Sequence, residues 1–286
     1  MRLRILYLLS LAVLSACGNK NGSFYTAPTG TLDSTNASTA KSQLATSAVV
    51  SFTKPGDVTA PSRATFPSSC YTADPTTKVD ADGDGIALKS VYTFNCSNTA
   101  GSGNSYTMKG SFTEADKDDT AGSNHAGGWR YDLDYTMTLA SARASTNGNY
   151  TLQGFFELTK GTANYTYASN YQMAFSGATS PTRATYDITF GSTWNHTITP
   201  DDMTQPKKTG SITFSGFWGY KYNVSTRASA SGELVLQGSS EGLKYDQACT
   251  YFYKEGTITF KAGTGSMTMT YGCDTATVVK LNGTTI

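Results

Sequence analysis

The stretch GGWRYDLDYTMTLAS (residues 127–141) alternates apolar and polar side chains without a break. Large apolar residues occupy the odd positions from Trp129 to Leu139, and Arg, Asp and Thr occupy the even positions between them. Because successive side chains of a β-strand point to opposite faces, this pattern predicts one long strand with one apolar face and one polar face.

The same alternation recurs along most of the remaining chain, in segments such as 150–158, 165–175, 184–198 and 212–224, with turns rich in Gly, Asn, Ser and Pro between them. Several of these strands should be roughly 35 to 45 Å long. Sheets twist, and a one-sided apolar face needs cover. The sequence therefore predicts an all-β fold, a long antiparallel meander of about ten to twelve strands that forms a barrel, a half-barrel or a two-layer sandwich. Helical periodicity is nearly absent, so we expect no long helix to cover the sheet.

The first residues, MRLRILYLLSLAVLSAC, have the layout of an export signal. Two arginines precede an apolar run, residues 5–13, that is shorter than the roughly 20 residues needed to span a bilayer. The run ends in LSAC, residues 14–17, which resembles the lipobox of bacterial lipoproteins. This resemblance implies cleavage after residue 16, a covalent lipid with acyl chains such as palmitate on Cys17, and anchoring in the cell envelope. Gly18, in place of an aspartate, favours the outer membrane.

Three regions follow from this pattern. Residues 1–16 are the expected signal peptide, residues 17–48 are polar and aperiodic and predict a lipidated cysteine with a flexible tether, and residues 49–286 form the β-rich domain. The full chain has a formal charge of +1, and loss of the two arginines of the signal peptide leaves −1. A nearly neutral chain without a basic cluster argues against a nucleic-acid partner.

Four cysteines remain in the expected domain, Cys70, Cys96, Cys249 and Cys273. An even number in an oxidising compartment predicts two disulfides. We favour the pairs Cys70–Cys96 and Cys249–Cys273, because each closes a local segment of similar length. A zinc site is the alternative, but the chain contains no C-x-x-C motif.

The segment VDADGDGI (residues 79–86) resembles the first half of the calcium loops in EF-hand, dockerin and thrombospondin-type repeats. The resemblance implies that Asp80, Asp82 and Asp84 offer carboxylates and that Ile86 offers its backbone carbonyl to Ca²⁺.

This acidic loop departs from the calcium-binding pattern at its twelfth position, where Val91 replaces the bidentate glutamate. Another segment would have to supply that ligand, and TEADKDD (residues 113–119) is rich in carboxylates. The alternative interpretation is an Asp-Gly turn in solvent.

Little in the sequence favours catalysis. No H-E-x-x-H or phosphate-binding glycine loop is present, and His196, on the apolar side of its segment, is interpreted as a core histidine. We therefore expect a non-enzymatic cell-envelope lipoprotein that binds a hydrophobic ligand in a β-barrel. The alternative is a surface-exposed structural or adhesive module, stabilised by calcium and disulfides, with a partner at the cell surface. A transmembrane barrel would show the same alternation, but the anchor, tether and disulfides disfavour it.

Overall fold

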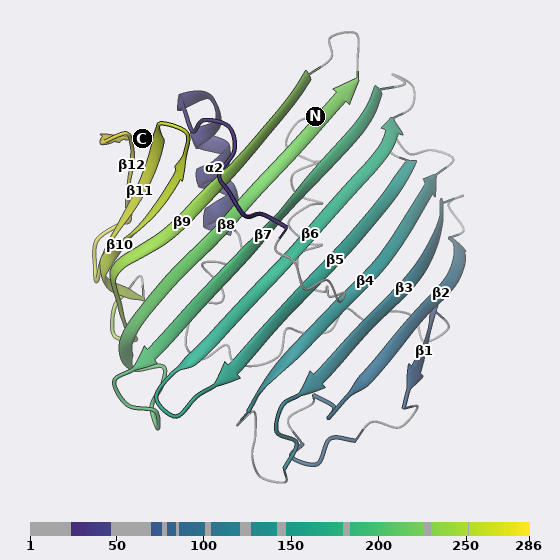
Figure 1. The fold of residues 1–286 in the computed structure, drawn as a ribbon, viewed down its shortest axis with the longest axis horizontal. Helices are drawn as coiled ribbons and strands as arrows, with labels where there is room; N and C mark the ends of the chain where they lie inside the picture. The colour runs from purple at the N-terminus through teal and green to yellow at the C-terminus, as the bar shows by residue number, and fades with distance from the viewer. Residues whose placement is uncertain are drawn as a thin grey trace.

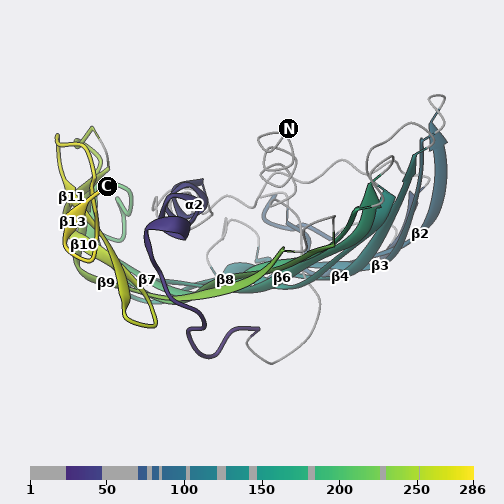
Figure 2. The same ribbon diagram turned by 90° about the horizontal axis from the view of Figure 1, so that it is seen from above.

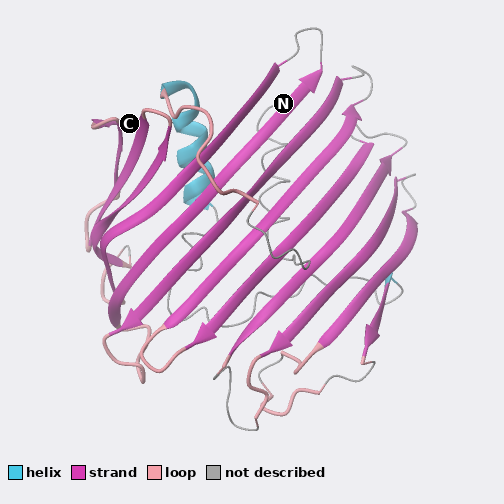
Figure 3. Cartoon of the chain, in the orientation of Figure 1, coloured by secondary structure: helices cyan, strands magenta, loops and turns pink. Residues whose placement is uncertain are grey.

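The computed structural model describes residues 24–46, 70–75, 79–83, 86–100, 104–120, 127–141, 147–179, 184–225, 230–250 and 252–286. These residues form a single antiparallel sheet in which strands adjacent in sequence are adjacent in space (Figures 1 and 3). The strands are β1 (Tyr71–Asp74), β2 (Ser90–Ala100), β3 (Asn104–Asp116), β4 (Gly128–Ser141), β5 (Asn147–Lys160), β6 (Tyr165–Thr179), β7 (Ala184–Pro200), β8 (Thr209–Ser225), β9 (Ala230–Asp246), β10 (Tyr253–Ala262), β11 (Gly265–Gly272), β12 (Val278–Leu281) and β13 (Thr284–Thr285). The predicted all-β meander is confirmed.

The sheet is open, because β1 and β13 are its two edges and do not pair with each other. Figure 2 shows that it curves strongly, with one concave and one convex face. Of the three predicted outcomes, the structure is the bent half-barrel. A ligand site enclosed in a closed barrel is therefore ruled out, and any such site has to lie on an open face.

The register of the strands collects the apolar side chains on one face. Tyr131 on β4 pairs with Phe156 on β5, and His196 on β7 pairs with Phe214 on β8. Figure 2 shows the helix α2 (Ser34–Thr46) on the concave side, and its buried Ala37 and Ala40 belong to the same apolar cluster as these rings. The concave face is therefore the apolar face, and most polar residues of each strand lie on the convex face. Glu114 and Asp116 are buried exceptions, which pair with Tyr131 and Trp129 on the concave face.

Two glycines in the middle of strands allow the concave face to bend. Gly154 on β5 and Gly216 on β8 have φ values of 138° and 154°. A Cβ at Gly154 would collide with the carbonyl oxygen of Asn170, and one at Gly216 would collide with the ring of Trp194. Large aromatic side chains can therefore lie across the backbone of these strands, which favours strong curvature.

Residues 24–46 correct part of the expected flexible tether of residues 17–48, because they are ordered against the sheet. Residues 24–29, which we call the strap, lie on the convex face, on the opposite side of the sheet from α2 (Figure 2). The strap is hydrogen-bonded to three strands. The backbone N–H of Phe24 donates to Asn170 Oδ1 (3.1 Å), the Tyr25 hydroxyl donates to the Gly219 carbonyl (3.2 Å), and Thr29 exchanges two backbone hydrogen bonds with Val235 (3.1 and 2.9 Å).

From the edge of β9 the chain passes to the concave side. The N–H of Leu32 donates to the carbonyl of Ala262 (3.2 Å), and Gly265 leaves room for the carbonyl of Leu32. The next residue, Asp33, caps α2, because its Oδ1 accepts from the N–H of Thr35 (2.8 Å) while its own N–H donates to Asn36 Oδ1 (3.0 Å).

The helix α2, 13 residues long, lies on the concave side (Figure 2), although the sequence predicted no long helix over the sheet. In the middle of the helix, Lys41 Nζ donates to the carbonyl of Ile286 (2.9 Å), which ties the helix to the C-terminus. No helix in the described part of the chain is long and apolar enough to cross a membrane.

Candidate functional site

Aromatic rings contact one another across almost the whole concave face. Such pairs contribute about 0.5–1.5 kcal/mol each beyond simple burial, so the row stiffens the sheet. The successive contacts, as distances between ring centroids, are Tyr71–Tyr92 (5.4 Å), Tyr92–Phe112 (5.4 Å), Phe112–Tyr131 (5.6 Å), Tyr131–Trp129 (5.0 Å), Trp129–Tyr167 (6.2 Å), Tyr167–His196 (5.6 Å), His196–Phe214 (5.1 Å) and Phe214–Phe260 (6.0 Å).

The concave face has two halves that differ in exposure. In the closed half, at the end of the sheet where β4, β6 and β8 begin, the inward residues are buried: Trp129, Tyr131, Leu133, Phe156, Leu158, Tyr165, Tyr167, Trp194, His196, Ile198, Ile212 and Phe214. In the open half, where the same strands end, Leu152, Met173 and Ala184 are buried, but most inward residues are half-buried: Tyr135, Met137, Leu139, Tyr150, Phe175, Tyr186, Ile188, Tyr220, Tyr222 and Val224.

Loops between the strands pack at the closed half. Met203, in the connection between β7 and β8, packs against the main apolar cluster. In the same connection the carbonyl of Pro206 accepts a hydrogen bond from the Tyr245 hydroxyl (2.8 Å). Phe252, just before β10, stacks on the Tyr245 ring with 5.3 Å between centroids. These contacts make the closed half part of the structural core.

The open half is uncharged at neutral pH. Its inward positions on β4–β8 carry no Asp, Glu, Lys or Arg. Burial raises the pKa of the Tyr150 phenol above its ordinary value. Burial also raises the pKa of Tyr220, with smaller contributions from Tyr222 and Asp33. A surface of neutral rings and aliphatic side chains suits an apolar molecule, with phenol hydroxyls available for hydrogen bonds.

His196 is the one histidine within the described residues, and the prediction that it lies in the core is confirmed. It is 1% exposed and lies between the rings of Tyr167 and Phe214. Burial lowers its pKa to about 3, so the imidazole is neutral at physiological pH. Its Nδ1 has no hydrogen-bond partner, which is an energetic cost and gives no sign of a catalytic partner.

A second candidate site is a group of three carboxylates next to β2 and β3. Oxygens of Asp80, Asp82 and Asp119 all lie within 4.8 Å of one another. Asp80 Oδ1 accepts from the N–H of Gly83 (2.9 Å), and Asp119 Oδ1 accepts from the N–H of Ala81 (2.6 Å). Three converging carboxylates are the kind of oxygen ligands that a hard divalent cation takes in proteins.

The predicted ligands of this acidic group are only partly brought together. Asp84 lies outside the described residues. A ligand role for the backbone carbonyl of Ile86 stays a prediction, and the side chain of this residue is buried in the apolar cluster. Asp119, from the acidic segment after β3, takes the place of a third ligand. Glu114 and Asp116, from the same segment, are buried residues at the end of β3 instead.

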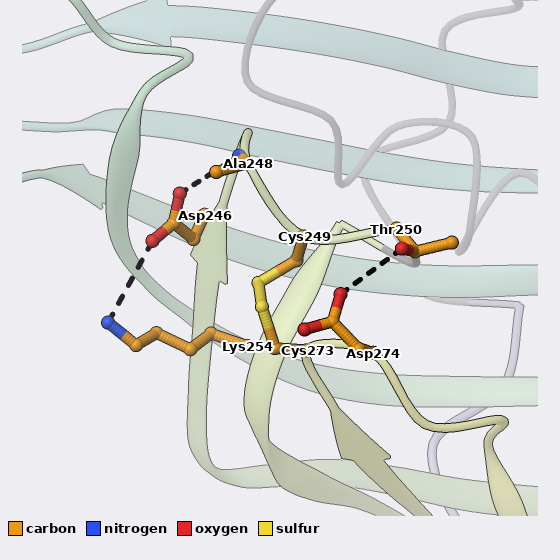
Figure 4. The surroundings of a disulfide bond; sticks show 7 residues. All are labelled: Asp246, Ala248, Cys249, Thr250, Lys254, Cys273 and Asp274. Carbon is orange, nitrogen blue, oxygen red and sulfur yellow. Dashed lines mark hydrogen bonds and ion pairs between the residues drawn. A yellow bond between two sulfur atoms is a disulfide. The ribbon is translucent and has the colours of Figure 1, made fainter.

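The two predicted disulfides are confirmed in their pairing. Cys70 and Cys96 are joined with 4.8 Å between Cα atoms, and Cys249 and Cys273 with 4.7 Å. Figure 4 shows the second bond in a turn where Asp246 accepts from the N–H of Ala248 (2.9 Å). The predicted lipidation site, Cys17, lies outside the described residues.

These features define an all-β protein built on one open, strongly curved antiparallel meander with an aromatic concave face. Comparisons with protein-family models, with curated proteins and with solved structures found no match.

Proposed function

We propose that the protein is a non-enzymatic lipoprotein of the cell envelope that binds an apolar molecule on the open half of its concave face. The observation that carries this proposal is the row of half-buried aromatic side chains, among them Tyr150, Phe175, Tyr186, Tyr220 and Tyr222. Contiguous apolar surface that stays partly accessible to water is unfavourable and marks ligand or interaction sites in other proteins. The lipobox-like sequence ending at Cys17 supports a membrane anchor, covalently acylated, for the mature chain.

The site favours a neutral ligand over a charged one. Burial raises the pKa of Tyr150 and of Tyr220, so both phenols stay neutral, and the inward strand positions of the open half carry no charged side chain. Each buried methylene of a ligand would contribute about 0.8 kcal/mol. A largely aliphatic or aromatic molecule with a few hydroxyl or carbonyl groups matches this chemistry.

Titration with the uncharged dye N-phenyl-1-naphthylamine tests the proposal. The double variant Tyr220→Ser/Tyr222→Ser should weaken dye binding at least about tenfold, which corresponds to roughly 1.4 kcal/mol. The matched control is Lys221→Ser/Asn223→Ser, on the opposite face of the same strand. Equal affinity for both double variants would argue against binding on this face.

The group of Asp80, Asp82 and Asp119 favours a second candidate, a surface-exposed structural or adhesive module stabilised by calcium and disulfides. A site with few ligands should bind calcium with a dissociation constant on the order of 10⁻⁴ to 10⁻³ M. At 10 mM calcium, linkage would then stabilise the fold by about 1.4 to 2.7 kcal/mol.

Thermal unfolding with and without calcium tests the second candidate. We expect calcium to raise the Tm of the wild type and to leave Asp82→Asn and Asp119→Asn unchanged. Asp134→Asn, on the convex face away from this group, is the control that should keep the shift. Identical Tm values with calcium and with a chelator would remove calcium from the proposal.

A further inference from the structure

The strap has a fixed starting point over the middle of the convex face. The N–H of Phe24 donates to Asn170 Oδ1, and that oxygen also accepts from Thr193 Oγ1 (2.8 Å). Asn170 is only 4% exposed and lies on β6, the sixth strand of the sheet. The amide of Asn170 therefore joins the strap to the centre of the sheet.

The rest of the strap is held at two further points. The ring of Tyr25 lies against Gly219 on β8, where a Cβ would approach it to 2.9 Å. Thr29 then pairs with Val235 at the edge of β9. Burial raises the pKa of the Tyr25 phenol, consistent with a ring packed between the strap and the sheet. The described chain therefore enters over β6 and leaves at β9.

The distance from Cys17 to this starting point is limited by chain length. Seven residue steps separate Cys17 from Phe24, which span at most about 25 Å. At about 4.8 Å per strand, the edge at β1 is roughly 24 Å from β6 and the edge at β13 is roughly 34 Å away. Along β6, Asn170 is five residues, or about 17 Å, from the first residue of the strand, Tyr165. It is nine residues, or about 30 Å, from the last residue, Thr179. The reach of about 25 Å therefore falls well short of the β13 edge and only equals the distance to the β1 edge, so a group on Cys17 stays on the convex side or at the end of the sheet where β6 begins.

We propose that the convex face of the sheet is the surface that faces the lipid bilayer, with the open half of the concave face directed away from it. This inference rests on the acylation of Cys17 in the proposed function. It also changes the expected geometry of the anchor, because the strap shortens the tether from about thirty residues to a few. The short remaining tether restricts how far the domain can swing above the membrane.

The chemistry of the convex face is compatible with this contact. The outward residues of β6, β7 and β8 are mainly Thr, Ser, Asn, Gln, Gly and Ala, with Asp187 and Lys221 as the charged residues at those described positions. This central part of the convex face is close to neutral, whereas β4 and β5 beside it carry the ion-paired Arg130, Asp132 and Glu157. Apposition of the central strands to lipid headgroups therefore involves little repulsion or loss of charge solvation. The lipid supplies the affinity, and the strap supplies the orientation.

The test uses the full-length acylated protein on phosphatidylethanolamine–phosphatidylglycerol vesicles that contain a nitroxide-headgroup lipid. A fluorophore is placed on one added cysteine, Ser215→Cys on the convex face or Ser38→Cys on α2. Both serines are exposed, so the labelled variants are matched. We expect severalfold stronger quenching of the probe at position 215. A Gly/Ser linker of about 20 residues inserted after Gly18, which adds up to roughly 65 Å of reach, should abolish the difference.

Mass spectrometry of the N-terminal peptide separates the two ways in which this inference can fail. If Cys17 carries no acyl chain, the proposed anchor is wrong and the membrane-facing surface is withdrawn with it. If Cys17 is acylated but the two probes are quenched equally, or the probe on α2 more strongly, the orientation alone is overturned and the anchor stands.

Discussion

The two halves of the concave face are built from the same strands and the same alternation, yet they differ in burial. On β4, Trp129 and Leu133 are each 1% exposed, whereas Met137 and Leu139 further along the same face are half-buried. Alternation therefore determines which face of a strand is apolar, and other parts of the chain determine how much of that face is covered. The closed half is structural core, and the open half is the part with surface to spare for binding.

Loss of the disulfide near the closed half should have the largest effect. Cys249 and Cys273 are 24 residues apart, and closing a loop of that length is worth about 3.5 kcal/mol in the chain-entropy model. The variant Cys249→Ser/Cys273→Ser should lose about this much stability in urea unfolding. A loss below about 1 kcal/mol would show that the packing of Phe252 on Tyr245 holds this turn without the covalent bond.

Two leucines on β4 provide a direct comparison of the two halves. Leu133→Ala removes a buried side chain and should cost roughly 3 kcal/mol, within the range of large-to-small core substitutions. Leu139→Ala removes the same atoms from the half-buried end and should cost about 1 kcal/mol or less. Chemical denaturation of the two variants measures the difference. Equal losses would mean that the open half is core as well.

Acid should lower the free energy of unfolding, because His196 is buried in the closed half as a neutral imidazole. The folded-state pKa of about 3 lies below the usual 6.5, so the unfolded state binds the proton first as the pH falls. The stability is full above pH 6.5 and declines below it, by about 2 kcal/mol at pH 5. His196→Phe keeps a ring between Tyr167 and Phe214 and should remove this dependence. A wild type whose unfolding free energy is the same at pH 7.5 and pH 5 would contradict a neutral buried imidazole.

The strands were predictable from sequence because their period is local. The stretch 127–141 corresponds to β4 and the stretch 184–198 to most of β7. The strap was missed, because its polar residues are held by contacts such as Asn170 and Val235, which are far away in sequence. The helix α2 was missed for a related reason. Among the side chains of α2 that the structure describes, the buried ones are Ala37 and Ala40, which are too small to give a clear apolar period, although Asp33 and Asn36 have the spacing of a capping box.

The acidic site was partly predictable. Asp80 and Asp82 follow a recognisable spacing, but Asp119 is distant in sequence. It reaches them because β2 and β3 form an antiparallel hairpin, so the residues before β2 and those after β3 lie at the same end. Pairing of two predicted strands therefore indicates which loops meet, before any side chain is placed.

The open half should show the smallest effect on stability. In Tyr220→Ser/Tyr222→Ser both side chains start half-exposed, so the unfolding free energy should fall by no more than about 1 kcal/mol. The same variant is expected to lose most of its dye binding. A loss of more than about 2 kcal/mol would assign these rings to the core and remove the reason to call the open half a binding surface. If stability is kept and binding is lost, the two tyrosines are not needed for folding. Binding of an apolar partner then explains why a row of large rings lies half-buried on the open half of the concave face.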